Sequence, residues 1–396
     1  MAERNDTLGI SVSVAKSAKH AEHPKAGVSP SLSRLRLIQV CGKEGDGVAI
    51  DAFACASELR EIMAPLCGKT LVTFDGVTLM RHLIHAGLPE KTPECCMLQW
   101  NALTNETAKT LTFESVLRRT LGVEVADESS LPDWGRKSLT PAQMEHAAGR
   151  AMHLVRLHEA LAARLRMKTL DQVYLRMRDA QRVIARMELH GIGFDAAGHA
   201  ALVAQWQAEA DALEKKLRKS AGPDINFDSD KQVGDWLRRT LPRERVAAWP
   251  RTPKEGLLRT AAAVLEEHSD IEAVSLLLQF SRLSDSLSRY GGSLAAFFDP
   301  VTGRMHADFH LTGAVTGRLS SSQPNLHSIP RRGGMKAFVV NTVHDDIMVE
   351  CPKSEAEKVE DILRESMTQA MLEMFPKAPT LRLVECGTGK SWAETK

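Results

Sequence analysis

The sequence predicts a mixed α/β protein with more than one domain, and three observations support this fold class. The chain has 396 residues, 43% hydrophobic and 26% charged, which is enough for two or three domains with cores of their own. Its front half alternates strand-like and helical patterns, and its middle carries long helical periods. From residue 301 the pattern changes to strand-like alternation interrupted by Gly, Ser and Pro.

The front half predicts a βα-type domain over residues 35–166, preceded by an N-terminal segment, residues 1–34, that we expect to be partly flexible. Residues 35–54 predict two strands, because apolar runs flank a Gly/Asp turn. Helical patterns follow at residues 78–87, 112–122 and 140–166. The last of these begins with the capping pair Thr140 and Pro141.

Residues 167–300 predict a mostly helical region. A first helix is indicated by apolar residues at steps of four and three that end before Gly191, namely Val173, Met177, Ala180, Ile184 and Met187. A second charged helix ends before Gly222, and a third begins in "NFDSDKQVGDWL" with an Asp or Ser cap. Apolar stripes of this kind pack inward, so they predict cores.

Charge and cysteine content restrict the cellular setting more than the function. Lys and Arg number 51 against 50 Asp and Glu, so the net charge favours no class of partner. The seven cysteines are odd in number and lack the C-x-x-C spacing of a zinc site or a disulfide framework, which favours a reducing cytoplasm. No apolar run suits a signal peptide or a membrane span. We therefore expect a soluble, cytoplasmic protein, which we take to be a monomer.

The stretch "TGRLSSSQPNLHSIP", residues 316–330, is the most informative part of the chain. Arg318 is a fork-shaped donor that suits phosphate or minor-groove acceptors, and it stands among short polar side chains, Thr316, Ser320, Ser321 and Asn325. A polar surface turn would explain three or four of these residues but not the whole string. The string closely resembles the "TGRLSS…PNLQNIP" signature of family A DNA polymerases, which links the thumb to the palm and lines the primer-template minor groove.

The resemblance continues in the family's order on both sides. Upstream, "VIARMELHGIGFD", "INFDSDKQVGDWL" and "RLSDSLSRYGGSL" are similar to segments that lead into and form the thumb. Downstream, "VHDDIMVECP" resembles motif C, with Asp346 where Glu is usual. The resemblance implies a thumb over residues 167–300, a truncated palm over residues 301–396, His344 beside the primer end, and Asp345 and Asp346 as catalytic carboxylates, with Asp345 a Mg²⁺ ligand.

A second resemblance covers the front half. "DWGRKSLTPAQMEHAAGRAMHLVRLHEAL" resembles the last part of the 3′-to-5′ exonuclease domain fused to these polymerases, which implies an RNase H-like α/β fold. Such exonucleases hold two metals with carboxylates. Here the family's Tyr and Asp positions are His146 and Arg150, its middle aspartate is Leu79, and its D-x-E pair falls around Ser11 and Ser13. We therefore expect a degenerate, inactive exonuclease domain, for which Asp46, Asp51 and Asp75 offer no replacement ligands.

The polymerase half departs from the family at residue 340. "GGMKAFVV" passes directly into "NTVHDDIMVE", where the family places motif A and the fingers. Two-metal phosphoryl transfer needs carboxylates from two separated strands, and neighbouring side chains on one strand point to opposite faces. The resemblance thus implies primer-template DNA as partner and Mg²⁺ as cofactor, but with an incomplete two-metal site and no evident deoxynucleotide site.

Three interpretations stay open from the sequence. The chain is an active or formerly active DNA-directed DNA polymerase, a non-catalytic DNA-binding accessory protein, or an internally deleted gene product. The last would leave sheet edges unpaired and apolar surface exposed, which favours aggregation.

Overall fold

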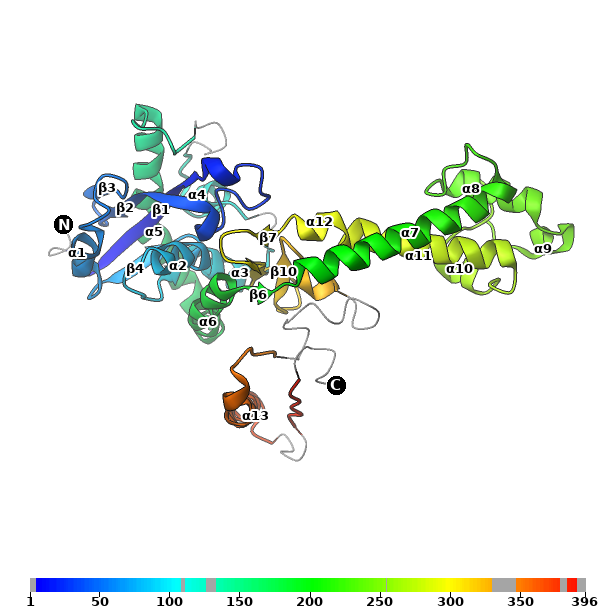
Figure 1. Ribbon diagram of the computed structural model, residues 1–396. Coiled ribbons are helices and arrows are strands. Elements are labelled where there is room, and N and C mark those ends of the chain that lie inside the picture. Colours follow the sequence, from blue (N-terminus) through cyan, green and yellow to red (C-terminus); the bar gives the residue numbers. More distant parts are fainter. Residues whose placement is uncertain are drawn as a thin grey trace. The chain divides into compact units, whose positions relative to one another are not determined.

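A computed structural model describes residues 5–107, 111–125, 133–253, 255–329, 347–377 and 383–389. It divides the chain into two compact units (Figure 1). Unit 1 comprises Met1–Phe194 and Phe297–Lys396, and unit 2 comprises Asp195–Ala296.

Unit 1 contains a mixed five-stranded sheet in the order β3-β2-β1-β4-β5. Its strands are β1 (Thr7–Lys16), β2 (Ser33–Cys41), β3 (Gly47–Asp51), β4 (Thr70–Thr73) and β5 (Glu94–Cys95). The central strand β1 runs antiparallel to β2 and parallel to β4. The predicted strand pair at residues 35–54 is confirmed as β2 and β3, which are antiparallel neighbours.

The sheet begins earlier in the chain than the boundary predicted at residue 35. Strand β1 lies within the segment that we expected to be partly flexible, and its Leu8 and Ile10 are fully buried. Apolar residues alternate along β1, as expected for a strand, but the Ser and Lys content around it conceals this signal. The segment is ordered because the other strands are built on both sides of it.

The helices of unit 1 are α1 (Leu59–Met63), α2 (Gly76–His85), α3 (Cys96–Thr104), α4 (Phe113–Leu121), α5 (Pro141–Met167), α6 (Asp171–His190) and α13 (Ala356–Met374). The predicted start of α5 is confirmed, because the Thr140 and Gln143 side chains form a reciprocal capping box. Helix α5 packs directly on β1. At Gly9 of β1, a Cβ atom would lie 2.5 Å from the Ala151 carbonyl oxygen of α5, so only glycine fits there without movement.

Helix α6 confirms the predicted helix and most of its predicted buried face. Ile184 is buried, and Met177, Ala180 and Met187 are half-buried, whereas Val173 is 48% exposed. The polar residues Gln181 and Glu188 are also buried: Gln181 Nε2 donates to the Pro93 carbonyl, and Glu188 pairs with Arg81 at 2.7 Å. Counting apolar residues missed these two positions, because partners far away in the sequence satisfy their polar groups.

Short strands lie on either side of the second unit in the chain. Strand β6 (Ile192–Gly193) precedes that unit, and β7 (Phe298–Asp299), β8 (Arg304–Met305), β9 (Asp308–His310) and β10 (Ser320–Ser322) follow it. Strands β6, β8 and β7 form one small sheet, and β9 and β10 form another. The alternation predicted from residue 305 therefore corresponds to two short strands, β8 and β9, rather than one.

Unit 2 is helical, as predicted. Its helices are α7 (Ala196–Ala221), α8 (Asp230–Thr240), α9 (Arg243–Ala248), α10 (Ala262–Glu266), α11 (Glu272–Tyr290) and α12 (Gly292–Ala295). The long helices α7 and α11 lie side by side (Figure 1). Ser229 caps α8 by accepting a hydrogen bond from the Gln232 amide, and the buried Trp236 belongs to the core. Across the described parts of both units, no helix is long and apolar enough to cross a membrane.

The close packing of α5 on β1 gives a matched pair of glycine variants. Gly9→Ala should lower the free energy of unfolding by about 1–3 kcal/mol, because the new methyl group meets the backbone of α5. Gly149→Ala, within α5 itself, should raise it by about 0.5–1 kcal/mol, because a Cβ there meets open space and glycine is a poor helix former. Urea unfolding followed by circular dichroism measures both. Equal midpoints for the two variants would contradict the described packing.

Candidate nucleic-acid interface

The loop predicted to contact nucleic acid, residues 316–325, is fixed at its C-terminal side by the hydroxyl group of Ser321. Strand β10 pairs with β9, so that Ser321 lies opposite Phe309. Ser321 is only 7% exposed, and its hydroxyl donates to the Pro324 carbonyl at 3.1 Å and accepts from the Leu326 amide at 3.2 Å. These bonds satisfy buried backbone groups that water cannot reach. In this structure Ser321 therefore fixes the conformation of the loop backbone.

The other side of the loop is fixed as well. On the N-terminal side, the side-chain amide of Asn105, the residue after α3, donates to the Val315 carbonyl at 2.9 Å. His310 Nε2 of β9 also shares a hydrogen bond of 2.7 Å with the Ser322 hydroxyl of β10. A side chain on Gly313 would overlap the hydroxyl of the half-buried Ser320. The backbone between β9 and β10 is therefore held at both ends.

Three of the predicted contact residues point their polar groups outward on this fixed backbone. Thr316, Arg318 and Asn325 are exposed. Within the described ranges, their side chains have no hydrogen-bond or ion-pair partner, and the Asn325 carbonyl alone is engaged, by Ser328. A free guanidinium between two short polar side chains can bind phosphate oxygens or base-edge acceptors without first breaking an internal bond.

The positions corresponding to exonuclease metal ligands carry no carboxylate. Ser11 donates to the side-chain oxygen of Gln39 at 2.8 Å, and Gln39 Nε2 donates to the Ser13 hydroxyl at 3.0 Å. Leu79 belongs to the apolar cluster beneath α2. His146 is buried on α5, and the Arg150 guanidinium lies 5.4 Å from the centre of the Phe113 ring.

A divalent metal ion needs an array of oxygen donors, and these residues supply neutral amide, hydroxyl and apolar groups together with a cation. The residues present do not fit a metal pair. The three remaining acidic candidates have structural partners instead: Asp75 caps α2, Asp51 pairs with Arg36 at 3.0 Å, and Asp46 accepts from Asn5.

A cluster of four charged side chains, absent from the sequence predictions, is buried behind the loop. It consists of Lys25, Arg81, Glu188 and Asp308, and we call it the buried charge cluster. Asp308 Oδ1 lies 2.7 Å from Lys25 Nζ and 2.8 Å from Arg81 Nη1. Arg81 Nη1 also lies 2.7 Å from Glu188 Oε2, and Glu188 Oε1 accepts from the Phe309 amide at 2.5 Å.

Burial and pairing affect the two carboxylates differently. Burial raises the pKa of Glu188 to about 7, against the opposing effect of Arg81. Burial also acts to raise the pKa of Asp308, but Lys25 and Arg81 together outweigh it and lower that pKa. Burial lowers the pKa of Lys25, and Asp308 opposes this. Asp308, shared by two cations, is thus the firmly ionised centre of the cluster.

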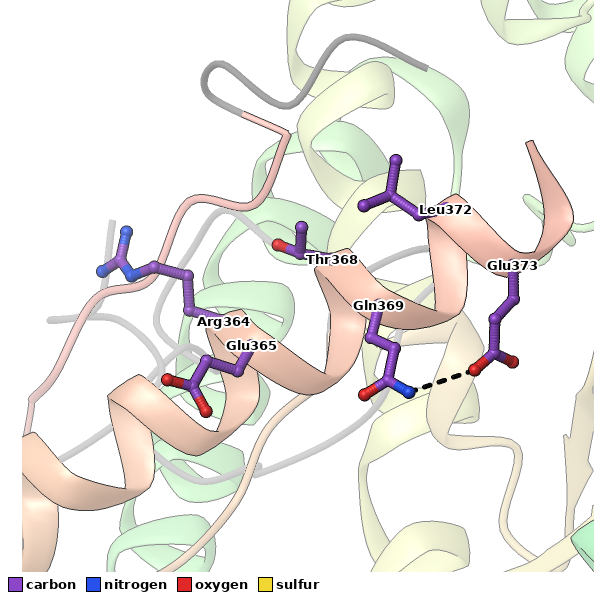
Figure 2. Close-up of a pocket in the computed structure, with 6 residues that line it drawn as sticks. All are labelled: Arg364, Glu365, Thr368, Gln369, Leu372 and Glu373. Carbon is purple, nitrogen blue, oxygen red and sulfur yellow. Dashed lines mark hydrogen bonds between the residues drawn. The ribbon is translucent and has the colours of Figure 1, made fainter. Parts of the chain in front are cut away.

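Among the described residues of unit 1 we consider two hollows as ligand sites. One, of about 160 Å³, borders the buried charge cluster and is lined by residues that include Gln181 and Asp308. The other, of about 590 Å³, is open and is lined by residues of α13 alone, among them Gln369, which donates to Glu373 (Figure 2). A single helix face lacks the convergent polar groups typical of a binding site.

The polymerase-type carboxylates cannot be placed in this geometry. His344, Asp345 and Asp346 lie outside the described residues. Among the residues that the structure does describe, no group of three or more His, Cys, Asp or Glu side chains is arranged to hold a metal ion.

Comparisons with known proteins agree on one family. The sequence profile of DNA polymerase family A matches residues 197–337. The chain is 38% identical over 192 residues to the thermostable DNA polymerase I of Thermus thermophilus, covering 48% of this chain and 23% of that protein. It is 30% identical over 240 residues to DNA polymerase I of Pseudomonas aeruginosa, covering 58% of this chain and 26% of that protein.

A solved structure has a similar fold. It is the POL domain of Pol1 from M. smegmatis in complex with DNA primer-template and dNTP, with a TM-score of 0.68 and 22% sequence identity over 85% of this chain and 55% of that chain. The chain spans about a quarter of the length of the two curated relatives.

The raised pKa of Glu188 gives a pH-dependent prediction. Because the folded-state pKa, about 7, lies above the ordinary value of 4.5, the contribution of Glu188 to stability is complete below about pH 4.5 and is lost as the pH rises through 7. In Glu188→Gln, the fall in free energy of unfolding between pH 5 and pH 8 should shrink by between about 1 and 3 kcal/mol.

Urea unfolding at the two pH values measures this difference. Glu159→Gln is the matched control, since Glu159 pairs with Lys43 on the surface and is 50% exposed. An unchanged pH dependence in Glu188→Gln would show that Glu188 is ionised throughout this range.

Proposed function

We propose that this chain, whose residues 197–337 match the profile of DNA polymerase family A, binds primer-template DNA and does not transfer nucleotides by itself. The binding surface in this proposal is the loop from Thr316 to Asn325. The ligand class follows from the family relationship, and the loop is the part of unit 1 best prepared to meet it.

The observation that carries the proposal is the exposed Arg318 on a fixed backbone, with no partner among the residues that the structure describes. A loop that is already held by Ser321, Asn105 and His310 loses little conformational entropy on binding. Its Arg318 side chain is free to release counterions from a phosphate or to read the minor groove.

Unit 2 offers exposed arginines with less support. Arg282 and Arg289 of α11 are each more than 60% exposed, but Arg282 pairs with Glu266 and Arg289 with Asp285. Binding phosphate through these arginines would compete with an existing acidic partner. We therefore assign the contact to the loop.

Catalysis is the step that the residues do not support. Family A polymerases use Mg²⁺, and two-metal transfer requires carboxylates from separated strands. The family profile ends at residue 337, and no acidic residue occurs between Phe338 and His344. Asp345 and Asp346 are one half of such a site, and we derive no catalytic step through a metal held by them alone.

The exonuclease-like part has a structural role in this proposal. The hydrogen-bonded set of Ser11, Gln39 and Ser13 occupies the place where metal ligands would be needed. The five-stranded sheet then serves as a scaffold from which the loop is presented.

A second candidate function is a DNA-directed DNA polymerase that works with residues supplied by another chain. The retained "VHDD" string favours it, because a lost activity gives no reason to keep Asp345. The two candidates agree on DNA binding and differ in whether a primer is extended.

The DNA-binding proposal is tested with Arg318→Gln and a fluorescent primer-template duplex. Affinity measured by anisotropy should fall by about 1–3 kcal/mol, and the slope of log affinity against log salt concentration should become shallower by about 1 if the guanidinium binds phosphate.

Lys43→Gln serves as the control, because Lys43 is also an exposed cation, 49% accessible, but lies away from the loop on β2–β3. Equal affinities for Arg318→Gln and Lys43→Gln would remove the loop from the binding surface. Unmeasurable affinity of the unaltered chain at low salt would defeat the proposed function as a whole.

A further inference from the structure

The connection between β1 and β2, residues 17–32, reaches across to the strands that carry the loop. It contains two short 3₁₀ turns, Ala18–His20 and Pro30–Leu32. The Ser31 hydroxyl donates to Asp299, a buried residue of β7. Val28 accepts a hydrogen bond from the buried His82 of α2 through its backbone.

Lys25 is the centre of this contact. Its side chain is 2% exposed, and its ammonium group donates to the His306 carbonyl at 2.8 Å and to Asp308 Oδ1 at 2.7 Å. His306 and Asp308 flank the start of β9. Lysine is seldom fully buried without a partner, so these two acceptors are what keeps residues 17–32 against β9.

The contact is transmitted from β9 to the loop. Asp308 lies opposite Ser322 and His310 opposite Ser320 in the β9–β10 pair. The next residue after Asp308, Phe309, donates its amide to Glu188 of α6. Moving Asp308 therefore moves the strand that positions both ends of the loop.

The firmly ionised member of the cluster is Asp308, which two cations share, whereas Glu188 has a pKa of about 7 and carries only part of a negative charge at neutral pH. Removing Lys25 would take away one of the two cationic partners of the buried Asp308 and the donor to the His306 carbonyl. A buried charge without its partner is strongly unfavourable, so β9 should detach locally rather than keep its place.

We propose that Lys25 is a positioning residue for the DNA-binding loop. It holds β9 in place and thereby fixes the positions of Thr316 and Arg318, without contacting DNA itself. This inference rests on the proposed function for its consequence, weaker DNA binding. The claim that Lys25 fixes the position of β9 and β10 does not depend on the proposed function, because it follows from the contacts of Lys25 with His306 and Asp308.

The test uses the full chain with Lys25→Met and two readouts. Without DNA, amide hydrogen exchange at residues 308–310 and 320–322 should rise by about a hundredfold or more, while α8 in unit 2 keeps its rate. With DNA, the affinity for a fluorescent primer-template duplex should fall at least about tenfold, because fewer molecules hold the loop in its binding position.

The salt dependence separates positioning from direct contact. A buried Lys25 binds no phosphate, so the slope of log affinity against log salt concentration should stay at its original value in Lys25→Met. Lys25→Arg, which keeps a cation able to donate to both acceptors, should restore much of the affinity. Lys43→Met, at an exposed ion pair, should change neither readout.

If Lys25→Met does not fold, the double variant Lys25→Met/Asp308→Asn replaces it in the test, because it removes both members of the ion pair. It should show the same rise in amide hydrogen exchange at residues 308–310 and 320–322. Unchanged exchange at residues 320–322 in a folded variant would overturn the proposal, as would an equal rise throughout β1 and β2. A local rise in exchange with no DNA binding by the unaltered chain would support the positioning role and defeat only the proposed function.

Discussion

The ion pairs of Asp308 with Lys25 and Arg81 are the interaction on which the arrangement of unit 1 depends. Three charged groups in a nearly water-free place are tolerable only if each keeps its partner, and these partners come from the β1–β2 connection, from α2 and from the segment after unit 2. Glu188 adds α6 to the same cluster. Segments separated by hundreds of residues are thereby fixed to one another, and β9 is held at the point from which the loop extends.

Because β9 is held in place, some loop residues can fix the backbone while others remain available to bind a ligand. Residues with buried or occupied polar groups, such as Ser321 and His310, hold the backbone. The side chains of Thr316, Arg318 and Asn325 are exposed and have no partner in the described part of the chain. The sheet of unit 1 has Ser11, Ser13 and Gln39 hydrogen-bonded to one another at the positions where the resemblance predicted metal ligands. Its close packing, as at Gly9 against α5, is consistent with the proposed role in presenting the loop.

Local signals made much of this architecture predictable from the sequence. The caps of α5 and α8 mark helix starts through neighbouring residues alone: the predicted cap at Thr140 is confirmed, and of the predicted Asp or Ser cap the structure has Ser229. The buried charge cluster was not predictable, because Lys25, Arg81, Glu188 and Asp308 are far apart in the sequence and each looks like an ordinary surface charge. For the same reason, the buried positions of Gln181 and Glu188 on α6 were missed. The loop string was recognisable as a unit, whereas the occupied hydroxyl of Ser321 follows only from the fold.

The central claim is that the chain binds primer-template DNA but lacks the opposing carboxylate needed to extend a primer. The most direct measurement is a primer-extension assay with Mg²⁺ and all four deoxynucleotides, under conditions where anisotropy shows the duplex to be bound. The expected result is no extension by the unaltered chain beyond the background of Asp345→Ala. Extension above that background would contradict the account and would show that Asp345 works in a complete site.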